Sequence, residues 1–167
     1  MTELDEIIEI LNKSRELYEK GFAMMNEGNN IIHDGICKYP NDISLRLALA
    51  AQMAGTGNFQ DAIELYQIVL RKSPNNPYAL TGMATIYFEL GKFRESLKLA
   101  QISLNIRDMP KTKILLCRHY LIQGNLIEVK KILSEILRKE PNNPQAILLN
   151  QRVEHVSAGD DLPENSR

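Results

Sequence analysis

Residues 77–104 read PYALTGMATIYFELGKFRESLKLAQISL, and this stretch decides the fold. In its first half, apolar and small side chains recur every three or four residues as far as Leu90, which is typical of an amphipathic helix. A second stripe with the same period begins at Phe93. Gly91 lies between the two stripes, where a glycine allows the positive φ with which many helices end. The stretch therefore predicts two helices joined by a tight turn.

The pattern recurs along the chain at a nearly constant interval. Gly57, Gly91 and Gly124 are separated by 34 and then by 33 residues, and a leucine follows each of them 13 positions later. The tetrapeptide Pro-Asn-Asn-Pro begins at Pro74 and again at Pro141. Self-similarity at such a period is typical of helical repeat arrays. It predicts three repeated helix pairs, at residues 43–76, 77–109 and 110–143.

The composition agrees with a helical protein that is not a general nucleic-acid binder. The chain has 167 residues, of which 44% are hydrophobic and 25% charged, and its formal net charge is −1. These values are ordinary for a soluble globular protein, and they provide no overall basic field that would attract nucleic acid. Aromatic residues make up only 6%, with no tryptophan, which favours helices over β-sandwiches. We expect an all-α protein.

Cysteine usage and hydropathy indicate the compartment. Cys37 and Cys117 are too few for a disulfide-rich secreted scaffold, and we expect both to be reduced. No apolar run approaches the roughly 18 residues that a membrane-spanning helix needs. The first six residues are acidic, whereas a signal or transit peptide would be basic. These features predict a cytoplasmic protein without membrane insertion.

The repeated residues resemble those of the tetratricopeptide repeat family. Its 34-residue unit places small, aromatic and glycine residues at fixed positions of two antiparallel helices. The second unit matches at Ala84, Tyr87, Gly91, Phe93, Ser96 and Ser103. The first and third units match at Ala50, Met53, Gly57, Phe59, Ala62 and Pro74, and at Cys117, Tyr120, Gly124, Leu126 and Pro141. The resemblance implies a right-handed superhelix, an α-α solenoid of antiparallel helix pairs.

Some residues depart from the family pattern. Met53 replaces an aromatic residue, Val129 and Ile136 replace small ones, and Asp108 stands where proline is usual. Most of these changes exchange one apolar side chain for another, which a helical core can accommodate by repacking.

The chain outside the three units is less regular. Residues 1–42 have a helical stripe from Leu4 to Leu11 without the repeat spacing, so they form either an N-terminal helical arm or a degenerate repeat. We expect residues 144–158 to form a capping helix, because the open end of a solenoid exposes apolar surface. Residues 159–167 are expected to be a disordered acidic tail.

No motif indicates catalysis, a cofactor or a metal. His33 and Cys37 could share a helical face as two metal ligands, but two ligands without partners make a weak site, and structural or exposed roles are favoured. Gly55-Thr56-Gly57 lacks the third glycine and the preceding strand of a dinucleotide-binding fingerprint. We therefore expect no enzyme activity and no cofactor.

The resemblance also implies a binding surface. In such a solenoid the first helix of each pair lines the concave side, where partners bind. The residues that would face this groove in the three units and the capping helix are Ser44, Leu47, Ala51, Ala54, Tyr78, Thr81, Thr85, Phe88, Lys111, Ile114, Arg118, Leu121, Gln145, Leu148 and Arg152. Several of them are apolar, and a contiguous apolar patch on a soluble protein marks an interface unless helix packing buries it.

These residues predict a non-enzymatic adaptor or scaffold that binds a partner peptide or helix. Apolar anchors of the partner would contact the groove residues Leu47, Tyr78, Phe88, Ile114 and Leu121. Lys111 and Arg118 would orient acidic groups, since lysine and arginine both recognise carboxylates.

One specificity of the family is not expected here. Members that bind heat-shock chaperone tails use a carboxylate clamp of lysine, asparagine and arginine side chains in successive first helices. At the comparable positions this chain has Leu47 and Ala51, then Thr81 and Thr85, and only Arg118 fits. The resemblance therefore implies that chaperone tails are not the ligand.

Two other functions remain open. The layout of a helical arm and three repeats is similar to that of bacterial type III secretion chaperones, which would imply dimerisation through residues 4–25 and capture of an unstructured hydrophobic client. Residues 91–140 contain 11 basic and 5 acidic residues, a net charge of +6, which would suit a nucleic-acid-binding helical repeat. Most of these basic residues lie on second helices, so an ordinary solvated face is favoured. Self-association through the N-terminal arm or an uncovered end of the array is a further expectation. The sequence does not name the partner, the pathway or the oligomeric state.

Overall fold

The computed structural model describes residues 2–19 and 22–158. Over these ranges the protein forms nine helices and no strand. They are α1 (Glu3–Glu19), α2 (Phe22–Lys38), α3 (Ile43–Gly55), α4 (Phe59–Lys72), α5 (Pro77–Glu89), α6 (Phe93–Ile106), α7 (Pro110–Ile122), α8 (Leu126–Lys139) and α9 (Pro144–Ala158). Within the same ranges, no helix combines the length and the apolar character that crossing a membrane requires.

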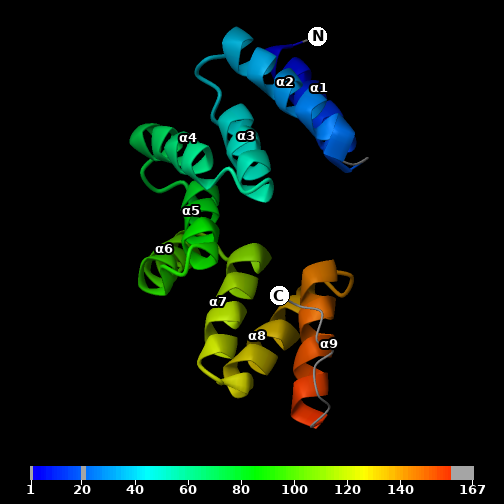
Figure 1. Cartoon of the computed structure of the whole chain (residues 1–167), viewed down its shortest axis with the longest axis vertical. Coiled ribbons are helices and arrows are strands. Elements are labelled where there is room, and N and C mark those ends of the chain that lie inside the picture. The colour runs from blue at the N-terminus through cyan, green and yellow to red at the C-terminus, as the bar shows by residue number, and fades with distance from the viewer. Residues whose placement is uncertain (1, 20–21, 159–167) are drawn as a thin grey trace.

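The helices form an elongated stack of antiparallel pairs (Figure 1). α1 packs on α2, α3 on α4, α5 on α6 and α7 on α8, while α9 packs on α8. The first helices of successive pairs also contact each other, from α1 through α3 and α5 to α7. This arrangement confirms the predicted all-α superhelix, and it places the first helices side by side along one surface.

The turn within each repeat depends on a glycine. Gly57, Gly91 and Gly124 have φ values of 81°, 73° and 72°. An added Cβ at any of these positions would meet no atom within 4 Å. The backbone conformation, rather than a lack of space, is therefore what favours glycine at the predicted turns.

The recurring Pro-Asn-Asn-Pro sequence marks the start of a helix. The side chain of Asn76 accepts hydrogen bonds from the backbone N–H groups of Tyr78 and Ala79 at 3.1 and 3.0 Å. Asn143 accepts in the same way from the N–H group of Ala146 at 3.0 Å. The second asparagine of each copy thus caps the helix that the following proline begins.

The apolar interior consists of several clusters rather than one core. One cluster surrounds Tyr66 and Met83, where α3, α4 and α5 meet, and another surrounds Cys117 and Leu133, where α7, α8 and α9 meet. Burial raises the pKa of the Cys117 thiol to about 12, so this group stays protonated at neutral pH. Its environment supports the packing role expected for this cysteine.

The N-terminal region forms a further helix pair. α1 and α2 each have 17 residues, whereas α3 and α4 have 13 and 14. The hydroxyl of Ser14 donates to the carbonyl oxygen of Gly28 at 3.0 Å and accepts from Nε2 of Gln52 at 2.6 Å. These bonds join α1 to α2 and to α3. The region predicted as an arm or a degenerate repeat is therefore a pair of long helices packed on the first repeat.

At the other end of the stack, α9 occupies the place of the predicted capping helix. Ala146 and Val153 are buried against α8, whereas Ile147 and Leu148 are exposed. The predicted tail, residues 159–167, lies outside the described residues.

Candidate peptide-binding groove

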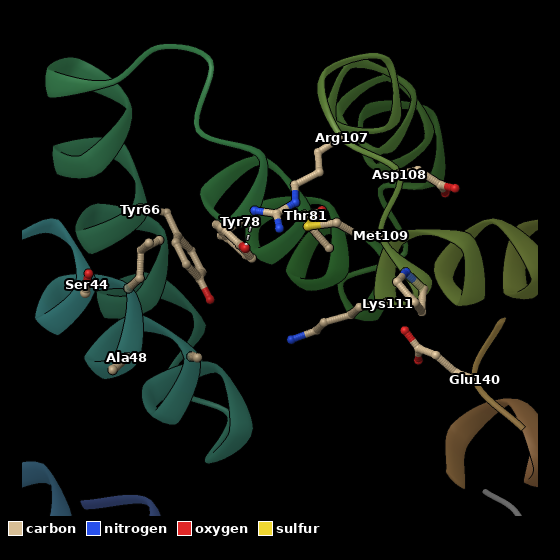
Figure 2. A pocket seen from close by; sticks show the side chains of 13 residues that line it. Ser44, Ala48, Tyr66, Tyr78, Thr81, Arg107, Asp108, Met109, Lys111 and Glu140 are labelled. Carbon is tan, nitrogen blue, oxygen red and sulfur yellow. Dashed lines mark hydrogen bonds between the residues drawn. The ribbon is translucent and has the colours of Figure 1, made fainter. Parts of the chain in front are cut away.

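A cavity of about 700 Å³ opens between α3, α5 and the loop that joins α6 to α7 (Figure 2). Its lining includes residues from three successive first helices. The predicted groove residues among them are Ser44, Leu47 and Ala51 of α3, Tyr78 and Thr81 of α5, and Lys111 of α7. Stacking of the first helices thus brings together side chains that are far apart in the sequence.

One wall of this cavity depends on a contact between α4 and α5. Tyr66 of α4 is almost completely buried, and its side chain forms part of the wall. Burial raises the pKa of its phenol to about 12, so the hydroxyl remains neutral. A Cβ on Gly82 of α5 would lie only 2.6 Å from Cε2 of this ring. The absence of a side chain at Gly82 lets Tyr66 lie against α5.

Behind the cavity, three buried hydroxyl groups join α5, α6 and α7. Oγ of Ser103 donates to the carbonyl oxygen of Pro77 at 2.9 Å, so it accepts from Thr81, whose Oγ1 is 2.8 Å away. Because the Thr81 proton is used in this bond, Thr112 donates to Thr81 over 2.7 Å. Thr81 lies at the cavity wall, and its hydroxyl holds the second and third repeats together.

Tyr78 provides an exposed aromatic surface at the cavity, with 49% of the residue exposed. Nη1 of Arg107 donates to the Tyr78 hydroxyl at 2.6 Å, and the guanidinium carbon is 5.4 Å from the centroid of the ring. Figure 2 shows the two side chains lying together. These contacts fix the ring in one orientation, which lowers the entropy that a ligand would lose on packing against it.

Acidic and basic groups at the cavity are separated. Asp108 forms ion pairs with Lys113 and Lys139, both at 2.9 Å, and hydrogen bonds from these ammonium groups lower the pKa of its carboxyl group. Lys111 is exposed and forms no ion pair within residues 2–19 and 22–158. Figure 2 shows its side chain extending toward α3. Lys111 and Arg107 thus place positive charges at the cavity, the Asp108 charge is neutralised at its edge, and the carboxylate of Glu140 also belongs to the lining.

Four other predicted groove residues make contacts elsewhere. Ile114 is only 9% exposed and belongs to the cluster between α7 and α8, and Leu121 packs against the same cluster. The guanidinium of Arg118 lies 4.1 Å from the centroid of the Phe88 ring and forms an ion pair with Glu89 at 2.7 Å. Helix packing thus removes Ile114 from the groove surface, and the charge of Arg118 already has a partner.

The remaining predicted residues do not line this cavity. Ala54 of α3 packs against the apolar cluster where α3, α4 and α5 meet. The hydroxyl of Thr85 donates to the carbonyl oxygen of Thr81 at 2.9 Å, within α5. On α9, Gln145, Leu148 and Arg152 are exposed. A binding role for these residues stays a prediction.

Sequence reasoning missed part of the lining. The additional residues are Ala48, Tyr66, Arg107, Asp108, Met109, Pro110 and Glu140. Three of them, Arg107, Asp108 and Met109, belong to the loop before α7. The sequence pattern places the groove on first helices and therefore leaves this loop out. Asp108 stands where the family pattern usually has proline, and this departure is the sequence signal that marks the loop as unusual.

The candidate metal ligands do not form a larger cluster. Nδ1 of His33 lies 3.9 Å from Sγ of Cys37, and both side chains are exposed. In the part of the chain that the structure describes, no three histidine, cysteine, aspartate or glutamate residues are grouped so as to hold a metal ion.

Comparison with known sequences supports the repeat architecture. Residues 53–108 match the family model described as tetratricopeptide repeat. A protein named CTR9 homolog from Arabidopsis thaliana is 31% identical over 96 residues, which are 55% of this chain and 9% of that protein. The chain thus matches a small fraction of the length of this relative.

Solved structures show the same fold. The first TPR domain of human RPAP3 has a TM-score of 0.61 at 23% identity, with 72% of this chain and 95% of that chain covered. The first TPR of Spaghetti (RPAP3), solved bound to the HSP90 peptide SRMEEVD, has a TM-score of 0.58 at 23% identity and covers 70% of this chain and 93% of its own. Pseudomonas aeruginosa PilF has a TM-score of 0.61 at 14% identity, with 86% of this chain and 65% of that chain covered. The matched residues and the stacked helix pairs together show that residues 53–108 contain tetratricopeptide repeat sequence and that the chain has the fold of tetratricopeptide repeat proteins.

Proposed function

We propose that this protein is a non-enzymatic adaptor that binds a peptide segment or helix of a partner protein in the cavity between α3, α5 and α7. The observation that carries the proposal is that one cavity holds the exposed Tyr78 ring and the ammonium group of Lys111, which has no ion-pair partner among the described residues. Apolar side chains of the partner would pack against Tyr78 and Leu47, and an acidic group would bind Lys111.

The size and chemistry of the cavity suit this role. Its volume of about 700 Å³ falls within the range of roughly 300–1,000 Å³ that ligand pockets have. Each apolar anchor that becomes fully buried contributes about 1.5–3 kcal/mol before the costs of ordering the ligand. The ammonium group of Lys111 adds selectivity at its part of the wall, because it attracts an acidic group of the ligand and repels a basic one.

The relative solved with SRMEEVD supports an acidic ligand, since that peptide has three acidic residues. The ligand proposed here is not the same peptide. This chain has Leu47 and Ala51 on α3, and Thr81 on α5, where the carboxylate clamp of chaperone-binding members has polar and basic groups. We therefore propose a ligand in which apolar contacts provide most of the affinity.

The first experiment is a selection with random peptides of about 12 residues displayed on phage, long enough to span the stacked first helices. Enriched peptides are synthesised with a fluorescent label, and their affinities are measured by anisotropy. Lys111→Glu is expected to weaken acidic peptides about tenfold or more, because repulsion replaces attraction at the cavity wall.

Lys130→Glu is the matched control, since Lys130 is exposed on α8 and does not line the cavity. It makes the same change of charge and is expected to leave the affinity unchanged. Coincident circular dichroism melting curves establish that both variants fold. Equal affinities of the two variants would contradict the proposed site.

A further inference from the structure

We propose that the groove continues from the first cavity across α3 onto α1, so that its ligand is an extended peptide with an acidic residue at the α7 end and aliphatic residues at the α1 end. This inference rests on the proposed function, because it concerns the same ligand. It gives the N-terminal helix pair a role in binding.

A second cavity, of about 370 Å³, lies between α1, α2 and α3. Leu11 and Arg15 of α1 and Gln52 of α3 line it. It shares Ala48 and Ala51 of α3 with the first cavity. Both shared side chains are single methyl groups, so α3 presents little bulk at the place where the two cavities adjoin.

Exposed apolar residues of α1 extend this lining. Leu4 and Ile8 are 65% and 47% exposed. Leu4 is seven residues before Leu11, and Ile8 is seven residues before Arg15, so the four side chains lie on one face of the helix. Because Leu11 and Arg15 line the second cavity, Leu4 and Ile8 continue the same surface toward the start of α1.

α1 is held firmly enough to present this surface. Glu6 forms hydrogen bonds with Lys38 and Tyr39 at the end of α2, and its carboxyl pKa is lowered by them. Further along α1, Ser14 connects this helix to α2 and α3 through the two hydrogen bonds described above. The face is thus formed before a ligand arrives, and binding does not have to order α1.

Gln52 contributes a hydrogen-bond acceptor without a partner. The Ser14 hydroxyl donates to Gly28 and can only accept from Gln52, which places Nε2 of the amide toward Ser14. Oε1 is then buried and has no hydrogen-bond partner in the described part of the chain. Buried acceptors are nearly always satisfied in folded proteins. A peptide N–H group in the second cavity would supply the missing donor after a small rotation of the amide.

The spacing of the helices sets the length of the ligand. The first helices α1, α3, α5 and α7 are successive neighbours, and packed helices have axes about 10 Å apart. Three such intervals span about 30 Å, which an extended chain covers with about nine residues at roughly 3.3 Å per residue.

A second copy of this chain is a poorer occupant for the face of α1. Glu3, Asp5 and Glu9 are exposed beside Leu4 and Ile8. Two α1 helices packed face to face in a parallel arrangement would bring these like charges together, which is unfavourable. A peptide whose aliphatic end is uncharged has no such cost.

The test uses the labelled peptides from the phage selection and synthetic halves of each. Ile8→Asp is expected to weaken the full-length peptides about tenfold and to leave the acidic half-peptides unchanged, because only the longer ligands reach α1. Ile127→Asp is the control, since Ile127 is 79% exposed on α8 and lines neither cavity. It should bind both sets of peptides like the wild type.

A second measurement makes the result independent of whether Ile8→Asp folds normally. Hydrogen exchange of the wild-type protein, with and without a full-length peptide, should show slower exchange in α1, α3 and α5 on binding, whereas an acidic half-peptide should leave α1 unchanged.

The outcomes separate the two proposals. Suppose that Lys111→Glu weakens peptide binding, while Ile8→Asp leaves the affinity unchanged and hydrogen exchange in α1 does not slow on binding. The proposed function then holds, and the extension onto α1 is wrong. A dimer in sedimentation that Ile8→Asp dissociates would identify a second copy as the occupant, and would also overturn the extension. If no peptide is enriched, or if Lys111→Glu has no effect, the proposed function itself fails.

Discussion

Gly82 shows how a single residue shapes the groove. It lies inside α5, where alanine would ordinarily favour the helix over glycine by about 0.5–1 kcal/mol. The Tyr66 ring fills the space that a Cβ at this position would need. Close packing of α4 on α5, and with it one wall of the first cavity, therefore depends on a residue that is locally unfavourable.

We predict that Gly82→Ala lowers the free energy of unfolding by about 1–3 kcal/mol, because the new methyl group displaces a buried ring. In a Tyr66→Leu background the same change is expected to be neutral or stabilising, since the collision is gone and the helix preference remains. Urea denaturation of the four proteins measures both effects. A cost of Gly82→Ala that is the same in both backgrounds would show that Tyr66 is not the cause.

His119 is a buried titratable residue between two helix pairs. Oγ of Ser96 donates to the carbonyl oxygen of Ala84 at 2.7 Å, so it accepts from Nε2 of His119 at 2.9 Å, which assigns the ring proton to Nε2. The Phe88 ring packs edge-on, with its centroid 4.8 Å from that of the imidazole. Burial, and to a smaller extent the charge of Arg118, lower the pKa of His119. The folded protein thus favours the neutral imidazole.

This environment makes stability depend on pH. In the unfolded chain a histidine titrates near its ordinary pKa of about 6.5, so below that pH the unfolded state binds more protons than the folded state. The free energy of unfolding should therefore fall as the pH decreases from about 7 to about 5. His119→Gln can still donate to Ser96 but cannot titrate, and its stability should depend less on pH. Thermal melts at both pH values test this, and an equal loss in the variant would rule out the effect.

At the scale of helices, α5 is buried on more sides than its sequence pattern indicates. The stripe of Leu80, Met83 and Ala84 predicts one buried face, yet Ala79, Gly82 and Ile86 are buried as well. α5 has neighbours on several sides, because it contacts α4 and α6 as well as α3 and α7. These neighbours explain why α5 is buried on more than one face, although Tyr78 at its start stays exposed.

The start of α5 offers a test of capping. Asn76→Ala removes the acceptor for two backbone N–H groups and should lower the free energy of unfolding by about 1 kcal/mol. Asn75→Ala is the control, because Asn75 is exposed and makes no capping bond. Denaturant titration compares the two variants. If both lost the same stability, the cap would not be the source of the effect.

For the whole molecule, the fold could be predicted because its determinants are local and repeated. The glycine turns, the asparagine caps and the helical stripes each act within a few residues, and the period shows how often they recur. The N-terminal pair was harder to predict, since α1 and α2 are longer than the other helices and residues 1–42 lack the repeat spacing. Its position depends on contacts such as Ser14 with Gln52, which no local pattern reveals.

The groove could be predicted only in part, because helix packing decides which side chains of a first helix line the cavity and which are buried between helices. Lys111 and Ile114 are three residues apart on α7 and were assigned to the same surface, yet Lys111 lines the cavity and Ile114 is buried in the cluster with α8. The ion pair of Arg118 with Glu89 joins residues 29 positions apart. Arg107 and Tyr78 are likewise 29 positions apart, and only the folded chain brings them together.

The open space around Gly57, Gly91 and Gly124 has a consequence for engineering the protein. Because a Cβ added at these positions would meet no atom within 4 Å, an inserted segment has room to leave the turn, provided that it returns the chain to the same two helix ends. None of the three glycines lines either cavity. Each turn is therefore a point at which a fluorescent or enzymatic reporter could be grafted, one per repeat along the stack, while the groove stays unobstructed.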